Sequence, residues 1–191
     1  MRARQHYMLI AAVMVAGSTG GAAGCLGTTP QEREPAVQGD YDDGDEEHRP
    51  GQPCLLCHGT GHLTKPPGGD VFVIAGTVYG TIDADEDDGL EDVAVVITDA
   101  QDREFTAMTN SAGNFMIDVD SGASAPRDKG KGKLGIPFTP TYPLSVVIRR
   151  DADEQVMRSH IWRDGSCAHC HGPTPGAASV GRVYLFDLEL Q

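Results

Sequence analysis

The sequence contains Cys-x-x-Cys-His-Gly twice, as CLLCHG at 54–59 and as CAHCHG at 167–172. Covalent haem attachment uses this order of residues, because two thiols add to the two vinyl groups of the porphyrin and the following histidine binds the iron. The two-residue gap gives the two sulfur atoms the spacing that the vinyl groups require. We therefore predict two haem c groups per chain. The predicted attachment sites are Cys54, Cys57, Cys167 and Cys170, and the predicted proximal iron ligands are His58 and His171.

Three other chemistries use the same cysteine spacing. Disulfides in an exported domain would account for all four cysteines but would leave His58 and His171 unexplained. A structural zinc site, with four cysteines or with mixed cysteine and histidine ligands, would tie the two ends of the domain together. A thioredoxin-like redox pair needs a helix N-terminus in a βαβ unit, which this sequence lacks. Two complete motifs favour haem. The alternative is a cysteine-stapled or zinc-binding extracellular sandwich that acts as a spacer or binding module.

The sequence constrains the sixth iron ligand less than the proximal one. Met157 and His160 precede the second motif, and His48 and His62 flank the first. A strand methionine often fills a core and a loop histidine is often solvated, so all four residues stay candidates. His169 lies between two cysteines, where we expect it to be exposed. A His/Met pair would raise the reduction potential, and a bis-histidine pair would lower it.

Two charged stretches lie outside the motifs. The stretch DADEDDGLED (83–92) contains Asp83, Asp85 and Asp87 at alternating positions, which could supply several of the roughly six to eight oxygens that Ca²⁺ takes. It is not an EF-hand, and a solvated charge run is the alternative. The stretch RDKGKGK (127–133) is basic and glycine-spaced, and we expect it to form a mobile loop.

Composition and missing motifs limit the class of function. The sequence shows no nucleophile elbow, phosphate loop or metalloprotease helix, so we expect an electron carrier and no enzyme. Reduction of peroxide at an open haem position stays an alternative, although no distal acid and base are identifiable. The net charge is -13, with Lys+Arg 15 against Asp+Glu 28. This balance disfavours nucleic acid as a partner and favours redox partner proteins with a basic docking surface.

Residues 1–25 have the pattern of a secretion signal. Two arginines precede an apolar run at 8–16 that is too short for a stable membrane span, and small residues lead up to Cys25. This pattern resembles the lipobox of bacterial lipoproteins, although Ala22 stands where leucine is usual. The resemblance implies that Cys25 is lipidated and anchors the chain in the bacterial cell envelope. The outer membrane is favoured because Leu26 replaces the aspartate that retains many lipoproteins at the inner membrane. An uncleaved anchor helix and ordinary secretion are the alternatives.

The remaining sequence predicts a tether followed by a β-sandwich. Residues 26–53 are rich in proline, glycine and acid, which predicts a disordered acidic tether. Several of the later apolar runs alternate with polar residues, and turn residues separate the runs, which predicts strands. The predicted strands cover 71–80, 93–100, 104–110, 114–119, 142–150, 154–162 and 181–190. We predict an all-β, antiparallel Greek-key sandwich of transthyretin or immunoglobulin type with about seven strands. The first haem motif would occupy 54–70, and the sandwich, 71–191, would carry the second at 167–171.

The block from 76 to 117 resembles the carboxypeptidase regulatory-like and Cna-B-type sandwich families. The residues that carry this resemblance are Gly76, Val78, Gly89, Leu90, Val93, Val95, Asp99, Thr109, Asn110, Gly113 and Phe115. Such modules serve as spacers, binders and scaffolds, and some bind calcium in acidic loops, so the resemblance implies a fold but no function. The whole arrangement, with CLLCHG before this block and CAHCHG after it, resembles bacterial dihaem c-type cytochrome lipoproteins whose motifs flank such a sandwich.

Overall fold

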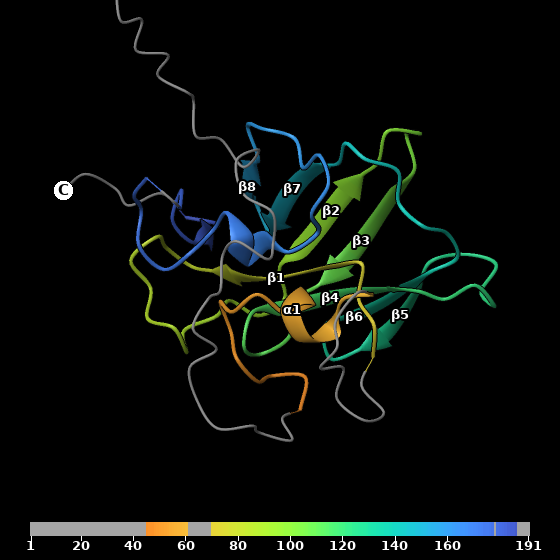
Figure 1. The fold of residues 1–191 in the computed structure, drawn as a ribbon. Coiled ribbons are helices and arrows are strands. Elements are labelled where there is room, and N and C mark those ends of the chain that lie inside the picture. Colours follow the sequence, from red (N-terminus) through yellow and green to blue (C-terminus); the bar gives the residue numbers. More distant parts are fainter. Residues whose placement is uncertain (1–44, 61–69, 178, 187–191) are drawn as a thin grey trace, which may run out of the picture.

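The structure is a computed structural model that describes residues 45–60, 70–177 and 179–186 (Figure 1). The predicted signal peptide, the predicted lipidation site Cys25 and the candidate ligand His62 lie outside these residues. No helix in the described part of the chain is both long and apolar enough to cross a membrane.

Two β-sheets pack against each other, and the described residues contain nine strands. The first sheet has the order β5-β6-β4-β1-β9 and the second the order β3-β2-β7-β8. The first contains β1 (Ile74–Tyr79), β4 (Asn114–Val119), β5 (Arg127–Gly130), β6 (Lys133–Ile136) and β9 (Val183–Tyr184). The second contains β2 (Ala94–Thr98), β3 (Glu104–Met108), β7 (Ser145–Arg150) and β8 (Asp153–Val156). The predicted all-β sandwich is confirmed.

Alternation along the strands places apolar side chains between the sheets. Phe105 and Ala107 of β3 are buried, as are Phe115 and Ile117 of β4, and all four belong to one core cluster. Successive strand residues point to opposite faces, so the residues between them face away from this core. On β1 both faces are covered, since all six of its residues are buried. The side of β1 opposite the core must therefore be covered by another part of the chain.

Two strand pairs depart from the purely antiparallel arrangement that we predicted. β1 pairs in parallel with β9, and β4 pairs in parallel with β6. The other five strand pairs are antiparallel. The parallel pairs arise because β6 and β9 do not join their neighbours through a tight hairpin. The chain leaves β4, forms β5 at the far edge and turns back into β6.

The basic stretch 127–133 is not the mobile loop that we expected. It forms β5 and the first residue of β6, joined by a turn. Lys129 Nζ donates a hydrogen bond to the Asp118 carboxylate of β4 at 2.6 Å. Leu134 and Ile136, which follow directly, are buried in the core. The prediction of a mobile loop was wrong because it considered only the charged and glycine residues of this stretch. The two apolar residues that follow are buried in the core and hold the hairpin in place.

The end of the predicted tether is also ordered. Residues 45–53, which we call the docking segment, lie against the first sheet. The backbone carbonyl of Glu46 accepts a hydrogen bond from Asn110 Nδ2 at 2.7 Å, and the Gly51 amide donates to Thr77 Oγ1 at 2.8 Å. Residues 45–53, which we expected to belong to the disordered tether, therefore form specific contacts with the sandwich. Composition predicts disorder here, but the contacts use backbone groups, which composition does not reveal.

Candidate functional site

Both Cys-x-x-Cys-His motifs fold into one short helical turn. These turns are α1 (Leu55–His58) and the 3₁₀ turn η1 (Cys167–His169). In each motif the histidine amide donates to the carbonyl of the first cysteine, at 2.8 Å to Cys54 and at 2.9 Å to Cys167. The amide of the second cysteine donates to the same carbonyl, at 3.2 Å and 3.1 Å respectively. Because residues three apart on a helical turn share one face, each turn brings its two cysteines to the same side.

Both motif histidines hold their ring through Nδ1. His58 Nδ1 bonds to the backbone carbonyl of Asp70 at 2.9 Å, and His171 Nδ1 bonds to that of Gly181 at 2.9 Å. A ring that donates from Nδ1 keeps its lone pair on Nε2, which is how metal-binding histidines are commonly oriented. The two carbonyls belong to different segments of the chain. The same ring arrangement is therefore built twice by different neighbours.

The first motif covers the face of the first sheet that points away from the core. Cys54 and Leu55 pack against Phe72, Ala75 and Met116, which form a cluster separate from the main core. Ala75 of β1 is directly opposite Met116 of β4 in the strand register. Figure 1 shows α1, in orange, beside these two strands. The first motif thus supplies the cover that the second face of β1 requires.

Polar side chains of the first sheet hold the docking segment in place. Asn114 Nδ2 donates to the backbone carbonyls of Glu46 and His48, at 3.4 Å and 3.2 Å. Thr77 Oγ1 donates to Asn114 Oδ1 at 2.6 Å while it accepts the Gly51 amide. Both Thr77 and Asn114 are buried. Since a buried polar group is costly when unpaired, these bonds fix where the docking segment lies.

Ion pairs also join the docking segment to the hairpin of β5 and β6. The Glu46 carboxylate lies 3.1 Å from Lys131 Nζ and 3.2 Å from Lys133 Nζ. A hydrogen bond from its own backbone, with those from the two lysines, lowers the pKa of Glu46 to about 2. The carboxylate is therefore charged across the neutral range. The hairpin that the sequence did not predict thus helps to position the first motif.

The second motif is built into the edge of β1. The Ala75 amide donates to the Gly165 carbonyl at 3.0 Å, and Ser166 forms a parallel bridge with Ala75. Cys167 then packs against the main core. A Cβ atom added to Gly76 would lie only 2.7 Å from both Cβ and Sγ of Cys167. Only glycine at position 76 leaves room for this close approach.

His169 is buried, so the expectation that it is exposed was wrong. It is 9% exposed, and its Nδ1 bonds to the Asp164 carboxylate. The other oxygen of Asp164 accepts the Ser166 amide at 2.9 Å. Burial alone would raise the pKa of Asp164, but the bonds from His169 and Ser166 lower it below its usual range. His169 Nε2 is buried with no hydrogen-bond partner among the described residues. Asp164 thus holds the turn of the second motif through hydrogen bonds to Ser166 and His169.

Three of the four motif cysteines, Cys54, Cys57 and Cys167, are free thiols. Burial raises the pKa of Cys54 to about 11 and that of Cys167 to about 12, and the second value also reflects the neighbouring Cys54. Both thiols are therefore protonated at neutral pH. A redox dithiol or a thiolate ligand usually has a lowered pKa, so these environments do not favour a thioredoxin-like pair.

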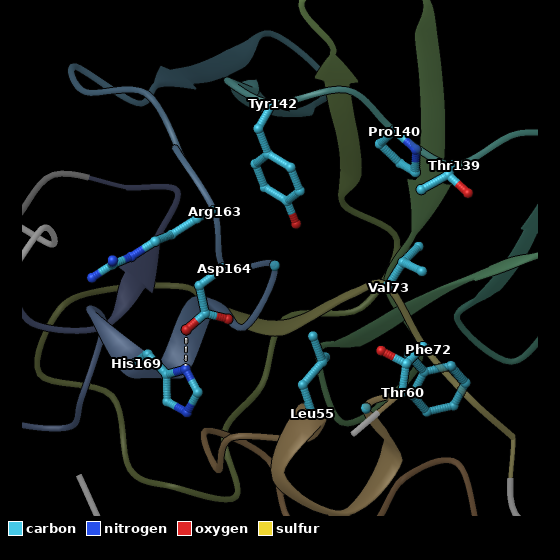
Figure 2. A pocket seen from close by; sticks show the side chains of 12 residues that line it. Leu55, Thr60, Phe72, Val73, Thr139, Pro140, Tyr142, Arg163, Asp164 and His169 are labelled. Carbon is cyan, nitrogen blue, oxygen red and sulfur yellow. Dashed lines mark hydrogen bonds and ion pairs between the residues drawn. The ribbon is translucent and has the colours of Figure 1, made fainter. Parts of the chain in front are cut away.

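A cavity of about 300 Å³ lies between the two motifs (Figure 2). Ligand pockets usually have volumes of roughly 300 to 1,000 Å³, so this cavity is a small one. Figure 2 shows the Tyr142 hydroxyl directed toward the space between Asp164 and Leu55. Burial, then the nearby Asp164 and Cys167, raises the pKa of Tyr142 to about 12. The lining residues are Leu55, Gly59, Thr60, Phe72, Val73, Thr139, Pro140, Tyr142, Arg163, Asp164, Gly165 and His169. Residues of both motifs thus line the same cavity.

The other predicted ligands are less closely grouped. Met157 follows β8 and is half-buried, and His160 is exposed with its ring centroid 6.3 Å from that of Trp162. His48 is half-buried, and its ring centroid lies 6.0 Å from that of His58. Of the candidate sixth ligands that the structure describes, His48 is therefore the one in ring contact with a motif histidine.

The structure does not assemble the predicted calcium site. Asp83, Asp85 and Asp87 are all exposed. Within residues 45–60, 70–177 and 179–186, no group of three or more His, Cys, Asp or Glu side chains is placed to hold a metal ion. Calcium binding by this loop stays a prediction from the sequence.

No protein-family model, curated protein or solved structure matches this chain. A function must therefore be argued from the two motifs and their surroundings.

Proposed function

We propose that this chain is an exported dihaem c-type cytochrome that carries electrons. The observation that carries the proposal is the repeated geometry of the motifs. Each forms the same hydrogen-bonded turn, and each histidine bonds a backbone carbonyl through Nδ1. A disulfide staple would not require this orientation of the histidines, whereas iron ligation through Nε2 would use it twice.

The residues fit covalent haem. A thioether forms when a thiol S–H adds across a vinyl C=C, so each attachment needs a reduced cysteine and no oxidant. Cys54, Cys57 and Cys167 are free thiols, as this addition requires. Bound haem would supply a reversible one-electron couple at the iron. Cys54, Cys57 and His58 would hold the first haem, and Cys167, Cys170 and His171 the second.

The closeness of the motifs supports electron transfer within the chain. Both contact β1, both line the same cavity, and Cys54 is near enough to Cys167 to affect its pKa. A path between two haems in this arrangement needs no substrate pocket. The net charge of -13 supports partner proteins with a basic docking surface.

The proposed location is the bacterial cell envelope, with a lipid on Cys25 and the outer membrane favoured. Each buried CH₂ of an acyl chain contributes about 0.8 kcal/mol, and two chains suffice for stable attachment. Mass spectrometry of the mature N-terminus should find an acylated Cys25, and a Cys25→Ser variant should leave the membrane fraction. A soluble wild-type protein that begins elsewhere would instead indicate a diffusing periplasmic carrier.

The closeness of Cys54 and Cys167, which belong to different motifs, favours a second candidate function. In that case the chain is a cysteine-stapled extracellular sandwich, a spacer or binding module without haem. Reduction would then lower its stability, and no visible absorption would appear under any expression condition.

Haem content separates the two functions. The chain should be produced with a cytochrome maturation system and analysed on denaturing gels and as the pyridine haemochrome. We expect a haem stain that survives denaturation and two haems per chain. The paired variants Cys54→Ser/Cys57→Ser and Cys167→Ser/Cys170→Ser should each keep one. Colourless protein with stoichiometric zinc, or with disulfides alone, would overturn the proposal.

A further inference from the structure

His48 and His58 lie at a spacing that suits a shared metal ion. Their ring centroids are 6.0 Å apart and their planes are inclined by 49°. A metal–nitrogen bond to histidine in proteins is about 2 Å long, so two imidazoles on opposite sides of one ion have centroids on the order of 6 Å apart. The observed separation agrees with that value. His48 comes six residues before Cys54 in the sequence, outside the motif itself.

The two rings are held in the same way. His48 Nδ1 bonds to the backbone carbonyl of Asp45, as His58 Nδ1 bonds to that of Asp70. With both Nδ1 atoms engaged, each ring keeps Nε2 for a metal. Phe72 stacks on His58 with centroids 5.0 Å apart and an interplanar angle of 28°. The His58 ring is therefore restrained by a hydrogen bond and by an aromatic neighbour.

The sandwich also holds the backbone that carries His48. The His48 carbonyl accepts a hydrogen bond from Asn114 Nδ2 at 3.2 Å. The carbonyl of Glu46, two residues earlier, accepts one from Asn110 Nδ2 at 2.7 Å. Glu46 is further paired with Lys131 and Lys133. An axial ligand needs a position that its supporting residues determine, and these contacts provide it.

We infer that His48 is the sixth ligand of the haem at the first motif, which is thereby a bis-histidine haem. This inference rests on the proposed function. The second motif is different, because no other imidazole is in ring contact with His171 among the described residues. The two haems would therefore have different reduction potentials, and the first would have the lower one if the second is ligated by methionine.

Replacement of His48 in the two-haem protein tests this assignment. The ferric proteins should be compared by electron paramagnetic resonance, by optical spectra and by redox titration. We expect His48→Ala to convert one of the two haems from low spin to high spin, and added imidazole to restore the low-spin signal. We expect His48→Met to raise the potential of one haem and leave the other unchanged. The matched control is Ser111→Ala, which removes a hydroxyl bonded to Glu47 of the docking segment but alters no imidazole.

The outcomes distinguish this inference from the proposed function. Two haems per chain with spectra and potentials unchanged in both His48 variants would overturn the ligand assignment and leave the cytochrome in place. Wild-type protein that takes up no haem would instead overturn the proposed function. If His48→Ala does not accumulate, the titration of His48→Met decides alone, since methionine can ligate iron while an uninvolved residue would shift neither potential.

Discussion

The two motifs form the same turn but contact different parts of the sandwich. The first lies on the outer face of the first sheet, where hydrogen bonds and ion pairs hold the docking segment beside it. The second is inserted at the edge of β1, where Cys167 joins the main core and Gly76 leaves it space. Both motifs pack on apolar residues of the sandwich, but only the first lies beside a segment that polar contacts hold in place. The difference predicts that the motifs will respond to different perturbations.

The charged groups around the two motifs differ as well. Burial lowers the pKa of His171, partly opposed by its bond to the Gly181 carbonyl. Beyond burial and the neighbouring Cys54, the Asp164 carboxylate next to the second motif also raises the pKa of Cys167, whereas the pKa of Cys54 is raised by burial and by Cys57. Because the groups around a metal site tune its reduction potential, the surrounding protein would distinguish the two proposed haems even with identical ligands.

The largest expected effect is at Gly76. Gly76→Ala places a methyl group 2.7 Å from Cys167 and 3.1 Å from the Phe115 ring, which forces the second motif away from β1. Overpacking of this kind costs about 1–3 kcal/mol of unfolding free energy, which urea denaturation measures. We expect haem uptake at the second motif to fall more than at the first.

The matched control is Gly80→Ala, just after β1. There an added Cβ has its nearest neighbour, a Phe186 ring atom, at 3.9 Å, so we expect little change. Equal losses of stability in the two glycine variants would show that Cys167 does not pack where the structure places it.

A more local effect, at the first motif and not the second, is expected at Asn114. Asn114→Ala removes the bonds to the Glu46 and His48 carbonyls and leaves the buried Thr77 hydroxyl without its acceptor. An unsatisfied buried group costs about 1–3 kcal/mol. Because the change releases the docking segment, limited proteolysis should cut within 45–53 earlier than in the wild type. The control is Thr106→Ala on an exposed position of β3, which should change stability by less than about 0.5 kcal/mol. Unchanged protection of 45–53 would refute this role of Asn114.

The smallest effect is a dependence on pH that is confined to the first motif. The pKa of Glu46 is lowered to about 2 in the folded chain, below its ordinary value. Its ion pairs therefore stabilise the docking segment fully above about pH 4.5, and this contribution is lost as the pH falls toward 2. Hydrogen-exchange protection factors of 45–53 should decrease in that window. Glu46→Gln should lower protection at neutral pH and remove this part of the pH dependence, whereas Glu104→Gln, an exposed residue of β3, should not.

Most of the strands could be predicted from the sequence, because strands depend on short-range patterns. The predicted strand 154–162 was too long, since β8 ends at Val156. The predicted strand 114–119 coincides with β4, and its alternating Phe115 and Ile117 face the core. The hairpin of β5 and β6 was missed because glycine-spaced lysines hide the apolar pair that follows them. Burial of His169 was missed because it depends on a bond to Asp164 across a turn.

The docking segment was missed for a related reason. Its position is determined by asparagine side chains that bond backbone carbonyls more than sixty residues away in the chain. Such pairs leave no periodicity in the sequence. Asn110 and Asn114, four residues apart and both buried, are the signal that could have indicated an additional backbone segment on that side of the sheet.

β1 is the strand against which both motifs pack, and this has a consequence for how the sequence can vary. Successive residues of β1 contact different motifs. Gly76 faces Cys167 of the second motif, whereas Ala75 and Thr77 contact the first motif and the docking segment. None of its six positions is exposed, whereas all four positions of β5 are. A saturation library of this chain should therefore tolerate many more residues along β5 than along β1, with the exception of Gly130, whose φ of +78° favours glycine. Many substitutions in β1 that leave the sandwich folded should still disturb one motif or the other, depending on whether the position is odd or even.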